Sequence, residues 1–458
     1  MRLQRRRTPR RLQGAAFVLL CVTLLLVTRV FQYFPGFGPI QELGFLLPLL
    51  AFLPMWLHLK RNIPVAQRRG LFMPYALGVM VLMPLWAGVM AQLVHGQPWY
   101  FGVLSLRGYA MITIPVLLLC LLQAGRITLQ DLDRALMTCA WFTMVIYVAM
   151  TLVLNPADFV NDSNTFVENR NDDGVRFKFS NALLLYALFS HGVKALRQRS
   201  WLHLLPALAL LAWMVGSAGG RILTLGVMLT TLLMLSLWGN FRTVMSGIAG
   251  MSLVIGLAVG IGTAVDSEAT HERLNKFKDA FEVFAADIDL IDDSSAASRV
   301  LQTLIALPYI EESPLLGNGR ISAQWIEGGY KGLIGEHFFP DDIGVFGMLM
   351  QFGVFGTLVL YGQFLLAIVL ILRWKASGRK GPNESVVLAC AAYAIYESLA
   401  SLANADAMMF PELTLLPIAV LTYAARASAA PPRRRRATEP GEASKPRPSA
   451  PLIKPIPL

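Results

Sequence analysis

The sequence has little charge: only 15% of its 458 residues are Asp, Glu, Lys or Arg, whereas 55% are hydrophobic. Soluble domains carry about 25% charged residues. The mean hydropathy of +0.53 therefore excludes a soluble enzyme and a nucleic-acid-binding domain. Apolar runs recur from residue 14 to residue 425, each long enough to cross a hydrocarbon core of ~30 Å. We expect a polytopic membrane protein.

Cysteine is also scarce, which excludes a secreted disulfide scaffold. The four cysteines all lie in apolar runs, too scattered to bind a metal: Cys21, Cys120, Cys139 and Cys390. The sequence has no P-loop, HExxH, GxSxG or CxxC motif. Acidic pairs that could hold a divalent cation occur at Asp172-Asp173, Asp292-Asp293 and Asp341-Asp342. Two of these pairs are more simply solvated loop residues, and we predict neither a metal nor a cofactor.

The distribution of charge along the chain predicts its orientation. Twelve spans are expected, at residues 14–34, 38–57, 72–94, 107–123, 135–154, 177–192, 201–217, 221–238, 243–264, 343–372, 385–403 and 411–425. With the N-terminus inside, the inner segments hold 28 of the 40 Lys and Arg but only 5 of the 29 acidic residues. Lys and Arg in short loops set membrane orientation. Both termini are therefore predicted to be cytoplasmic, and the net charge of +11 reflects topology rather than a nucleic-acid partner.

These spans divide the chain into five parts. They are a basic cytoplasmic N-terminus (1–13), spans one to nine (14–264), a large outer loop (265–342), spans ten to twelve (343–425) and a Pro-rich basic tail (426–458). The tail has a disordered composition, and its arginine run is expected to lie near anionic lipid.

Two segments outside the spans are long enough to carry structure. Residues 155–178 are polar and acidic, as in a solvated outer loop. Within the outer loop, apolar spacing predicts an amphipathic helix over 271–284 and a second helix over 298–310, ending before Pro314.

Arginines on the otherwise acidic outer side are the strongest functional candidates. Arg221 opens a span directly after small residues, where a helix N-terminus and close backbone access favour anion binding. Arg299 begins the second loop helix, and Arg320 either joins it or is simply solvated. Arg107, at the mouth of the fourth span, is a weaker candidate. Other charged residues in or near spans are functional candidates with pairings that the sequence does not reveal: Arg29, Glu42, Glu397 and Asp406.

The spacing around these arginines resembles a known family. Arg299 stands fifteen residues before Pro314 and eighteen before Gly317, in a segment that reads PLLGNG. This is similar to the R…PLLGxG signature of the O-antigen ligase and O-antigen polymerase superfamily. Arg221 resembles the family's S-R at the start of a span, and the GVFG turn at 353–356 resembles its ExGxxG segment.

The sequence departs from the family pattern at the expected histidine. Counting back eleven residues from Gly353 lands on Asp342, while His337 lies five residues upstream in HFFPDDIG. Either residue could act as general base or orient a sugar hydroxyl. His337 and Asp342 therefore both remain candidates for the catalytic role.

The resemblance implies a GT-C-like, all-α membrane enzyme with about twelve transmembrane helices and one large helical periplasmic loop, in the bacterial inner membrane. It implies a metal-independent, inverting glycosyltransferase that moves a glycan from undecaprenyl diphosphate to a glycan or lipid A core acceptor. Arg221, Arg299 and Arg320 would bind the diphosphate. The variant loop favours an exopolysaccharide or O-antigen polymerase over a ligase, with a chain-length regulator as a further partner.

An alternative of another class is a lipid-linked oligosaccharide flippase or other transporter. It would place its essential charges along a central pathway, at Glu42, Glu397 and Asp406, rather than at the outer rim. It would leave the outer loop and the arginine spacing unexplained.

Overall fold

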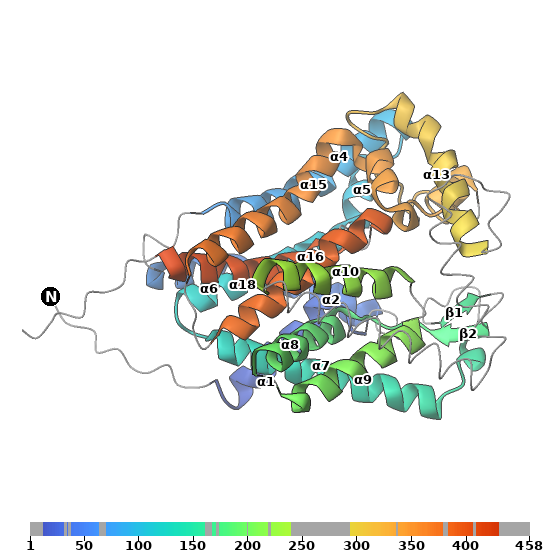
Figure 1. The fold of residues 1–458 in the computed structure, drawn as a ribbon. Coiled ribbons are helices and arrows are strands. Elements are labelled where there is room, and N and C mark those ends of the chain that lie inside the picture. Colours follow the sequence, from blue (N-terminus) through green and yellow to red (C-terminus); the bar gives the residue numbers. More distant parts are fainter. Residues whose placement is uncertain are drawn as a thin grey trace, which may run out of the picture.

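A computed structural model gives the fold. It describes residues 12–31, 34, 38–63, 70–160, 167–170, 174–198, 200–218, 221–239, 294–335, 338–378, 383–405 and 409–429. These residues form a bundle of helices (Figure 1), so the predicted helical fold class is confirmed. The predicted span 243–264 and the predicted helix 271–284 lie outside the described residues.

The helices of the first half are α1 (Ala15–Val27), α2 (Gly38–Asn62), α4 (Phe72–His95), α5 (Trp99–Ser105), α6 (Thr113–Gln123), α7 (Leu129–Val153), α8 (Ala182–Gln198), α9 (Trp201–Ala218) and α10 (Arg221–Trp238). Those of the second half are α13 (Ser294–Glu312), α14 (Tyr330–Ile334), α15 (Gly344–Ala376), α16 (Glu384–Ala403) and α18 (Pro411–Ala429). Short 3₁₀ helices are η1 (Arg107–Ile112), η2 (Pro156–Phe159) and η5 (Pro340–Ile343).

The described helices include five that are long and apolar enough to cross a membrane, or six if the bent pair of α5 with Arg107–Gln123 counts as one span. They are α2, α4, α7, α16 and the stretch Pro340–Ala376. Three shorter apolar helices, Ala15–Val27, Trp201–Met214 and Leu223–Trp238, fall where further spans were predicted. The chain is thus a helical membrane protein, of whose twelve predicted spans the structure supports five or six.

Burial separates central helices from peripheral ones. In α16, 72% of the most apolar window is buried, and the helix packs against α8, α10, α15 and α18. In α2, only 11% is buried, and this helix packs mainly against α6 and η1.

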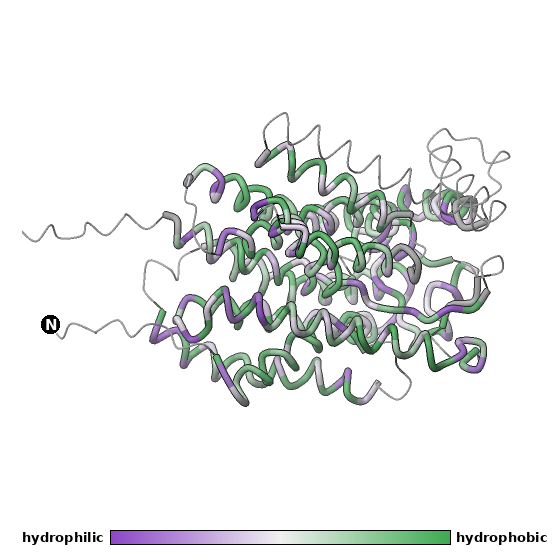
Figure 2. The backbone as a smooth tube through the Cα atoms, turned by 60° about the horizontal axis from the view of Figure 1, so that its bottom comes forward, coloured by the Kyte–Doolittle hydropathy of each residue, from purple (hydrophilic) through white to green (hydrophobic). Residues whose placement is uncertain are grey.

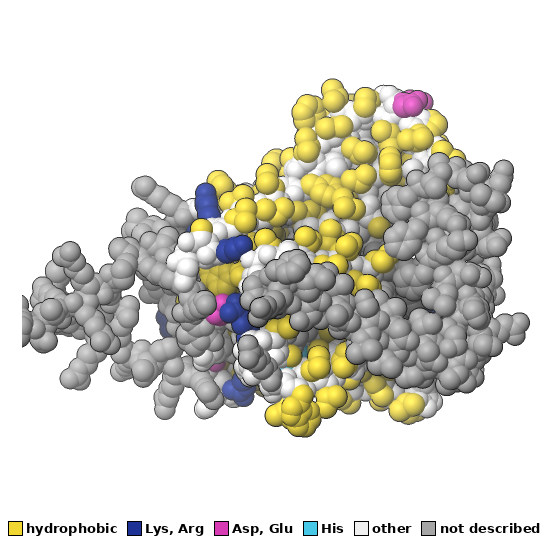
Figure 3. Space-filling view, in the orientation of Figure 1, with side chains coloured by type: hydrophobic (Ala, Val, Ile, Leu, Met, Phe, Trp, Pro, Cys, Tyr) yellow, Lys and Arg dark blue, Asp and Glu magenta, His cyan; other side chains and the backbone are white. Residues whose placement is uncertain are grey.

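Hydrophilic residues lie mainly toward helix ends and connections (Figure 2). Hydrophobic side chains cover the middle of the bundle, and the visible Lys and Arg gather toward its left end (Figure 3).

Two segments outside the predicted spans have regular structure. The predicted helix 298–310 is confirmed as α13, which extends further at both ends. In the stretch predicted as a solvated loop, β1 (Val167–Arg170) pairs antiparallel with β2 (Gly174–Phe177). Val167 and Phe177 are buried in one cluster with Met150 of α7, which anchors this hairpin to the bundle. The two strands read VENR and GVRF, with few of the β-branched and aromatic residues by which a strand is recognised in a sequence.

Candidate functional site

The helix α15 is broken near its start. Gly353 has φ 60° and ψ −174°, outside the helical region. A break in a helix frees backbone N–H and C=O groups, which need other partners where they are buried. The predicted turn at 353–356 therefore exists as an interruption within one long helix.

The segment Pro314–Arg320, here called the docking turn, fills this break with reciprocal hydrogen bonds. Val354 and Phe355 donate their N–H groups to the carbonyls of Pro314 and Leu315, while Asn318 and Gly319 donate to those of Met350 and Gln351, at 2.8–3.2 Å. The PLLGNG segment and the GVFG turn thus contact each other directly.

Three glycines allow this close approach, and all have positive φ: Gly317 (73°), Gly319 (81°) and Gly353 (60°). A Cβ on Gly319 would lie 2.1 Å from the backbone nitrogen of Ala91 in α4, and one on Gly353 would lie 2.4 Å from the carbonyl of Leu315. The docking turn is therefore held between α4 and α15 at backbone contact distance.

The docking turn fixes the position of Arg320. The Arg320 N–H donates to the carbonyl of Ala87 (3.2 Å), and the Arg320 carbonyl accepts from the side chain of Gln97 (2.9 Å). The guanidinium binds Asp341 through two N–H···O bonds of 2.7 and 3.1 Å, and also donates to Gln351 (2.7 Å). Arg320 is therefore not the solvated residue that the sequence left open.

The charge of Arg320 is secured by its partner. Burial lowers the pKa of the guanidinium, but the charge and hydrogen bonds of the Asp341 carboxylate outweigh burial, and the net pKa is raised. Arg320 thus stays protonated throughout the biological pH range.

Arg320 lines a partly open, mainly polar cavity of about 250 Å³, here called the arginine cavity. Two further arginines face the same space, Arg29 from the end of α1 and Arg107 from the start of η1. Tyr109, Asp341 and Phe410 are among its other lining residues. Residues far apart in sequence therefore converge on one site with three guanidinium groups.

Arg29 is the most buried of the three arginines, with 8% of its surface exposed. Its Nε donates to Glu412, which is fully buried at the start of α18, at 2.6 Å. Its guanidinium carbon lies 4.3 Å from the ring centroid of Phe410 and 5.5 Å from that of Phe45, within cation–π range. The backbone of Arg29 has φ 49°, a left-handed value that a non-glycine residue rarely adopts.

Arg107 forms the exposed side of the cavity. Its guanidinium binds Glu42 of α2 through Nε and Nη2, and Nη1 donates to the carbonyl of Leu104 at 3.0 Å. About 41% of the Arg107 side chain and 51% of the Glu42 side chain are exposed, so this pair joins α2 to η1 where solvent reaches it. All three arginines of the cavity thus have a carboxylate partner.

The other candidates lie elsewhere. Arg221 is the first residue of α10, as expected, but its side chain lies outside the described part of the chain. Arg299 lies in the second turn of α13 and is not among the cavity-lining residues. His337 also lies outside the described residues. Asp342 is exposed at η5, and its neighbour Asp341 is the carboxylate that faces the cavity.

Sequence reasoning missed how the site is composed. Arg29 and Arg107 were only minor candidates, and Glu412 was not singled out. The sequence did contain one signal for these residues. An ionisable residue inside or beside an apolar run is a functional candidate by default. Periodicity does not show that Arg29 pairs with a residue 383 positions later.

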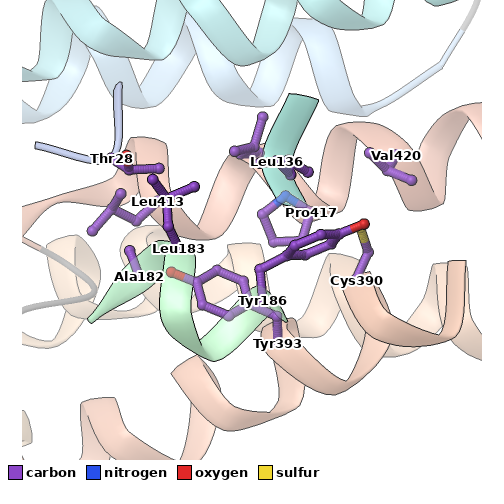
Figure 4. A pocket seen from close by; sticks show the side chains of 11 residues that line it. Thr28, Leu136, Ala182, Leu183, Tyr186, Cys390, Tyr393, Leu413, Pro417 and Val420 are labelled. Atoms are coloured by element: carbon purple, nitrogen blue, oxygen red, sulfur yellow. The ribbon is translucent and has the colours of Figure 1, made fainter. Parts of the chain in front are cut away.

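A second hollow lies deeper in the bundle (Figure 4). It measures about 20 Å³, and its lining includes Leu183, Tyr186, Cys390 and Pro417. A space of this size holds about one water molecule, so it is a packing gap rather than a binding site. Among the described residues, no cluster of three or more His, Cys, Asp or Glu side chains could hold a metal ion.

We predict that Asn318→Leu destabilises the protein by about 2 kcal/mol, because two carbonyls lose their donor. Asn318 is fully buried, and its amide donates to the carbonyls of Tyr309 (2.8 Å) and Met350 (3.0 Å). Thermal unfolding of the detergent-solubilised protein would measure the loss. Asn62→Leu is the control, since Asn62 is exposed and makes a single bond of 3.5 Å. Equal melting temperatures for the two variants would contradict the role of Asn318.

The described residues define a helical membrane protein with an arginine-lined cavity at one end of its bundle. Neither a protein-family model nor a curated protein sequence matches this chain.

Proposed function

We propose that the protein is a membrane glycosyltransferase of the O-antigen polymerase or ligase type. It would span the bacterial inner membrane twelve times with both termini in the cytoplasm, and would act on the periplasmic face. The observation that carries the proposal is the arginine cavity, where Arg29, Arg107 and Arg320 face one polar space. Arginine forms charge-assisted, often bidentate bonds with phosphate.

A lipid-linked diphosphate is the anion that fits this setting. No nucleotide sugar is expected on the periplasmic side, so the donor would arrive as a glycan on undecaprenyl diphosphate, diffusing in the bilayer. The peripheral helix α2 contributes Phe45 to the cavity lining and presents exposed leucines to its surroundings. On that side, α2 would therefore lie between the cavity and the lipid.

The proposed chemistry is an inverting displacement. The hydroxyl oxygen of the acceptor attacks the anomeric carbon of the donor, while the bond from that carbon to the diphosphate oxygen breaks. Arg107 and Arg320 would stabilise the negative charge that grows on the departing diphosphate, in place of a metal ion. The proton of the hydroxyl would pass to a base in the segment before α15, where His337 and Asp342 remain the candidates. Asp341, bound to Arg320 and Gln351, would position Arg320.

The alternative, a flippase or other transporter, has weaker support. Glu42 pairs with Arg107 at the exposed side of the cavity, and the Glu397 carboxylate bonds to Tyr393 within α16. The inner hollow of about 20 Å³ is too small to hold a sugar. Asp406 lies outside the described residues.

A deletion strain tests the proposal through its surface glycan and its extracted lipid-linked pool. We expect single repeat units to accumulate on the carrier, in the outer leaflet, as for a polymerase that has lost its activity. Full-length chains stranded on the carrier would instead assign a ligase that acts on lipid A core. Repeat units retained in the cytoplasmic leaflet would refute the transferase and favour the flippase. Such a polymerase would have a chain-length regulator among its partners.

A further inference from the structure

The ion pair between Arg29 and Glu412 is incompletely satisfied. One bond joins the two side chains, from Arg29 Nε to Glu412 Oε1. Among the described residues, no group accepts a hydrogen bond from Arg29 Nη2 or donates one to Glu412 Oε2, although both atoms are buried. A buried polar atom without a partner is costly, and more so when it is charged. The charged Arg29–Glu412 pair is therefore less stable than a pair joined by two hydrogen bonds would be.

The surroundings of Arg29 give it room to change partners. Arg29 lines the arginine cavity, and Nη2 lies against Gly108, where a Cβ would come within 2.5 Å of it. Phe410 and Phe45 contact the guanidinium through their rings, and such contacts tolerate a shift in its position better than a hydrogen bond does. Its left-handed backbone adds a strained element at the same residue.

We infer that an anion bound in the arginine cavity draws Arg29 away from Glu412, and that Glu412 then takes up a proton. An anion with oxygens at several positions can accept from the Arg29 N–H groups that Glu412 leaves unused. Glu412, fully buried, would then be a carboxylate without its cation, which is far less stable than the neutral acid. Anion binding in the cavity is thereby coupled to proton uptake. The inference rests on the proposed function only for its choice of a diphosphate as the anion.

The groups that face Glu412 favour its protonation once Arg29 has moved to the anion. Tyr109 of η1 and Tyr393 of α16 lie close enough to interact with its charge, and neither is a cation. Tyr393 is itself bonded to Glu397, a second carboxylate. Arg320, a cation that also interacts with Tyr109, is already paired with Asp341. In the described part of the chain, Glu412 thus depends on Arg29 for its compensating charge.

Calorimetric titration of the purified full-length protein tests the coupling. The probe is P¹,P²-dimethyl diphosphate, which resembles the doubly esterified donor and has no proton that titrates near neutral pH. Titrations at one pH, in buffers of different ionisation enthalpy, report the protons taken up on binding. We expect close to one proton per molecule bound, and an affinity that rises up to about tenfold for each pH unit lowered.

Variants assign the proton to Glu412. Glu412→Gln still accepts from Arg29 and should fold, but its binding should take up no proton, depend little on pH and be at least as tight as wild type. Glu384→Gln removes the carboxylate of a different ion pair, with Arg197 at 2.7 Å, and should keep the full proton uptake. Arg29→Gln should weaken binding at least tenfold.

Each outcome decides between the inference and the proposed function. Binding without proton uptake in the wild type, or uptake that persists in Glu412→Gln, would overturn the inference while leaving the transferase intact. If anion binding is coupled to proton uptake but the protein transfers no glycan, the inference stands and the proposed function is refuted. Absence of binding would overturn both the inference and the diphosphate site.

Discussion

Replacing Gly319 by alanine is expected to prevent the protein from reaching its folded state. The added Cβ would lie 2.1 Å from the Ala91 nitrogen and 2.5 Å from the Ala87 carbonyl, and both belong to the backbone of α4. Backbone atoms inside a helix cannot move away cheaply, and φ of 81° adds strain for any residue with a side chain. The combined cost is about 3–5 kcal/mol, comparable to the whole stability of a marginal protein. The yield of monodisperse protein and its melting temperature in detergent would measure the effect.

A control separates the packing effect from the backbone effect. Gly378 has a similar φ of 62°, but a Cβ there meets no atom within 4 Å. Gly378→Ala should therefore cost only about 1 kcal/mol, the price of the left-handed conformation. If both variants folded equally well, the tight fit of the docking turn between α4 and α15 would be wrong.

The substitution Arg320→Ala is expected to lower glycan transfer about 100- to 1000-fold, as when a transition-state anion loses one fixed donor. It would also destabilise the fold by roughly 2 kcal/mol, since the Asp341 carboxylate keeps its charge but loses its cation, and the Gln351 amide at 3.4 Å is a weaker partner. That cost is moderated because about 35% of the Asp341 side chain is exposed. Complementation of the deletion strain, with the glycan ladder normalised to protein in the membrane, gives the readout. Arg320→Lys retains the charge but cannot bind Asp341 and Gln351 in the same geometry, so we expect an intermediate loss.

Asp341→Asn distinguishes a functional arginine from a structural ion pair. This variant breaks the same pair but leaves the Arg320 guanidinium in the cavity, with Gln351 still accepting from it. It should destabilise the protein about as much as Arg320→Ala yet retain far more activity. If the two variants lost activity equally, glycan transfer would require the intact Arg320–Asp341 pair rather than the Arg320 guanidinium by itself.

The sequence predicted some features of the molecule because they depend on local pattern. Apolar runs indicated a helical membrane protein, helical spacing indicated α13, and glycines indicated a turn at Gly353. The composition of the cavity was not accessible in this way. Asp341 and Asp342 are identical in type and adjacent, and the 3₁₀ helix at Pro340–Ile343 decides which of them faces Arg320. The pairing of Arg29 with Glu412 joins the segment that follows α1 to the start of α18, 383 positions later, and no local signal in the sequence indicates it.

The arrangement of the cavity has a consequence for how the protein is made. Its arginines stand at positions 29, 107 and 320 of the sequence. Phe410, which also lines the cavity, stands just before α18. These residues are synthesised in that order. Arg29 is therefore present in the membrane before most of the chain, including Glu412, has been made. The docking turn emerges before α15, and the backbone groups at the break in α15 find their partners only when both are present. A nascent chain halted before α18 therefore lacks Glu412, and such an intermediate has Arg29 without its counter-charge.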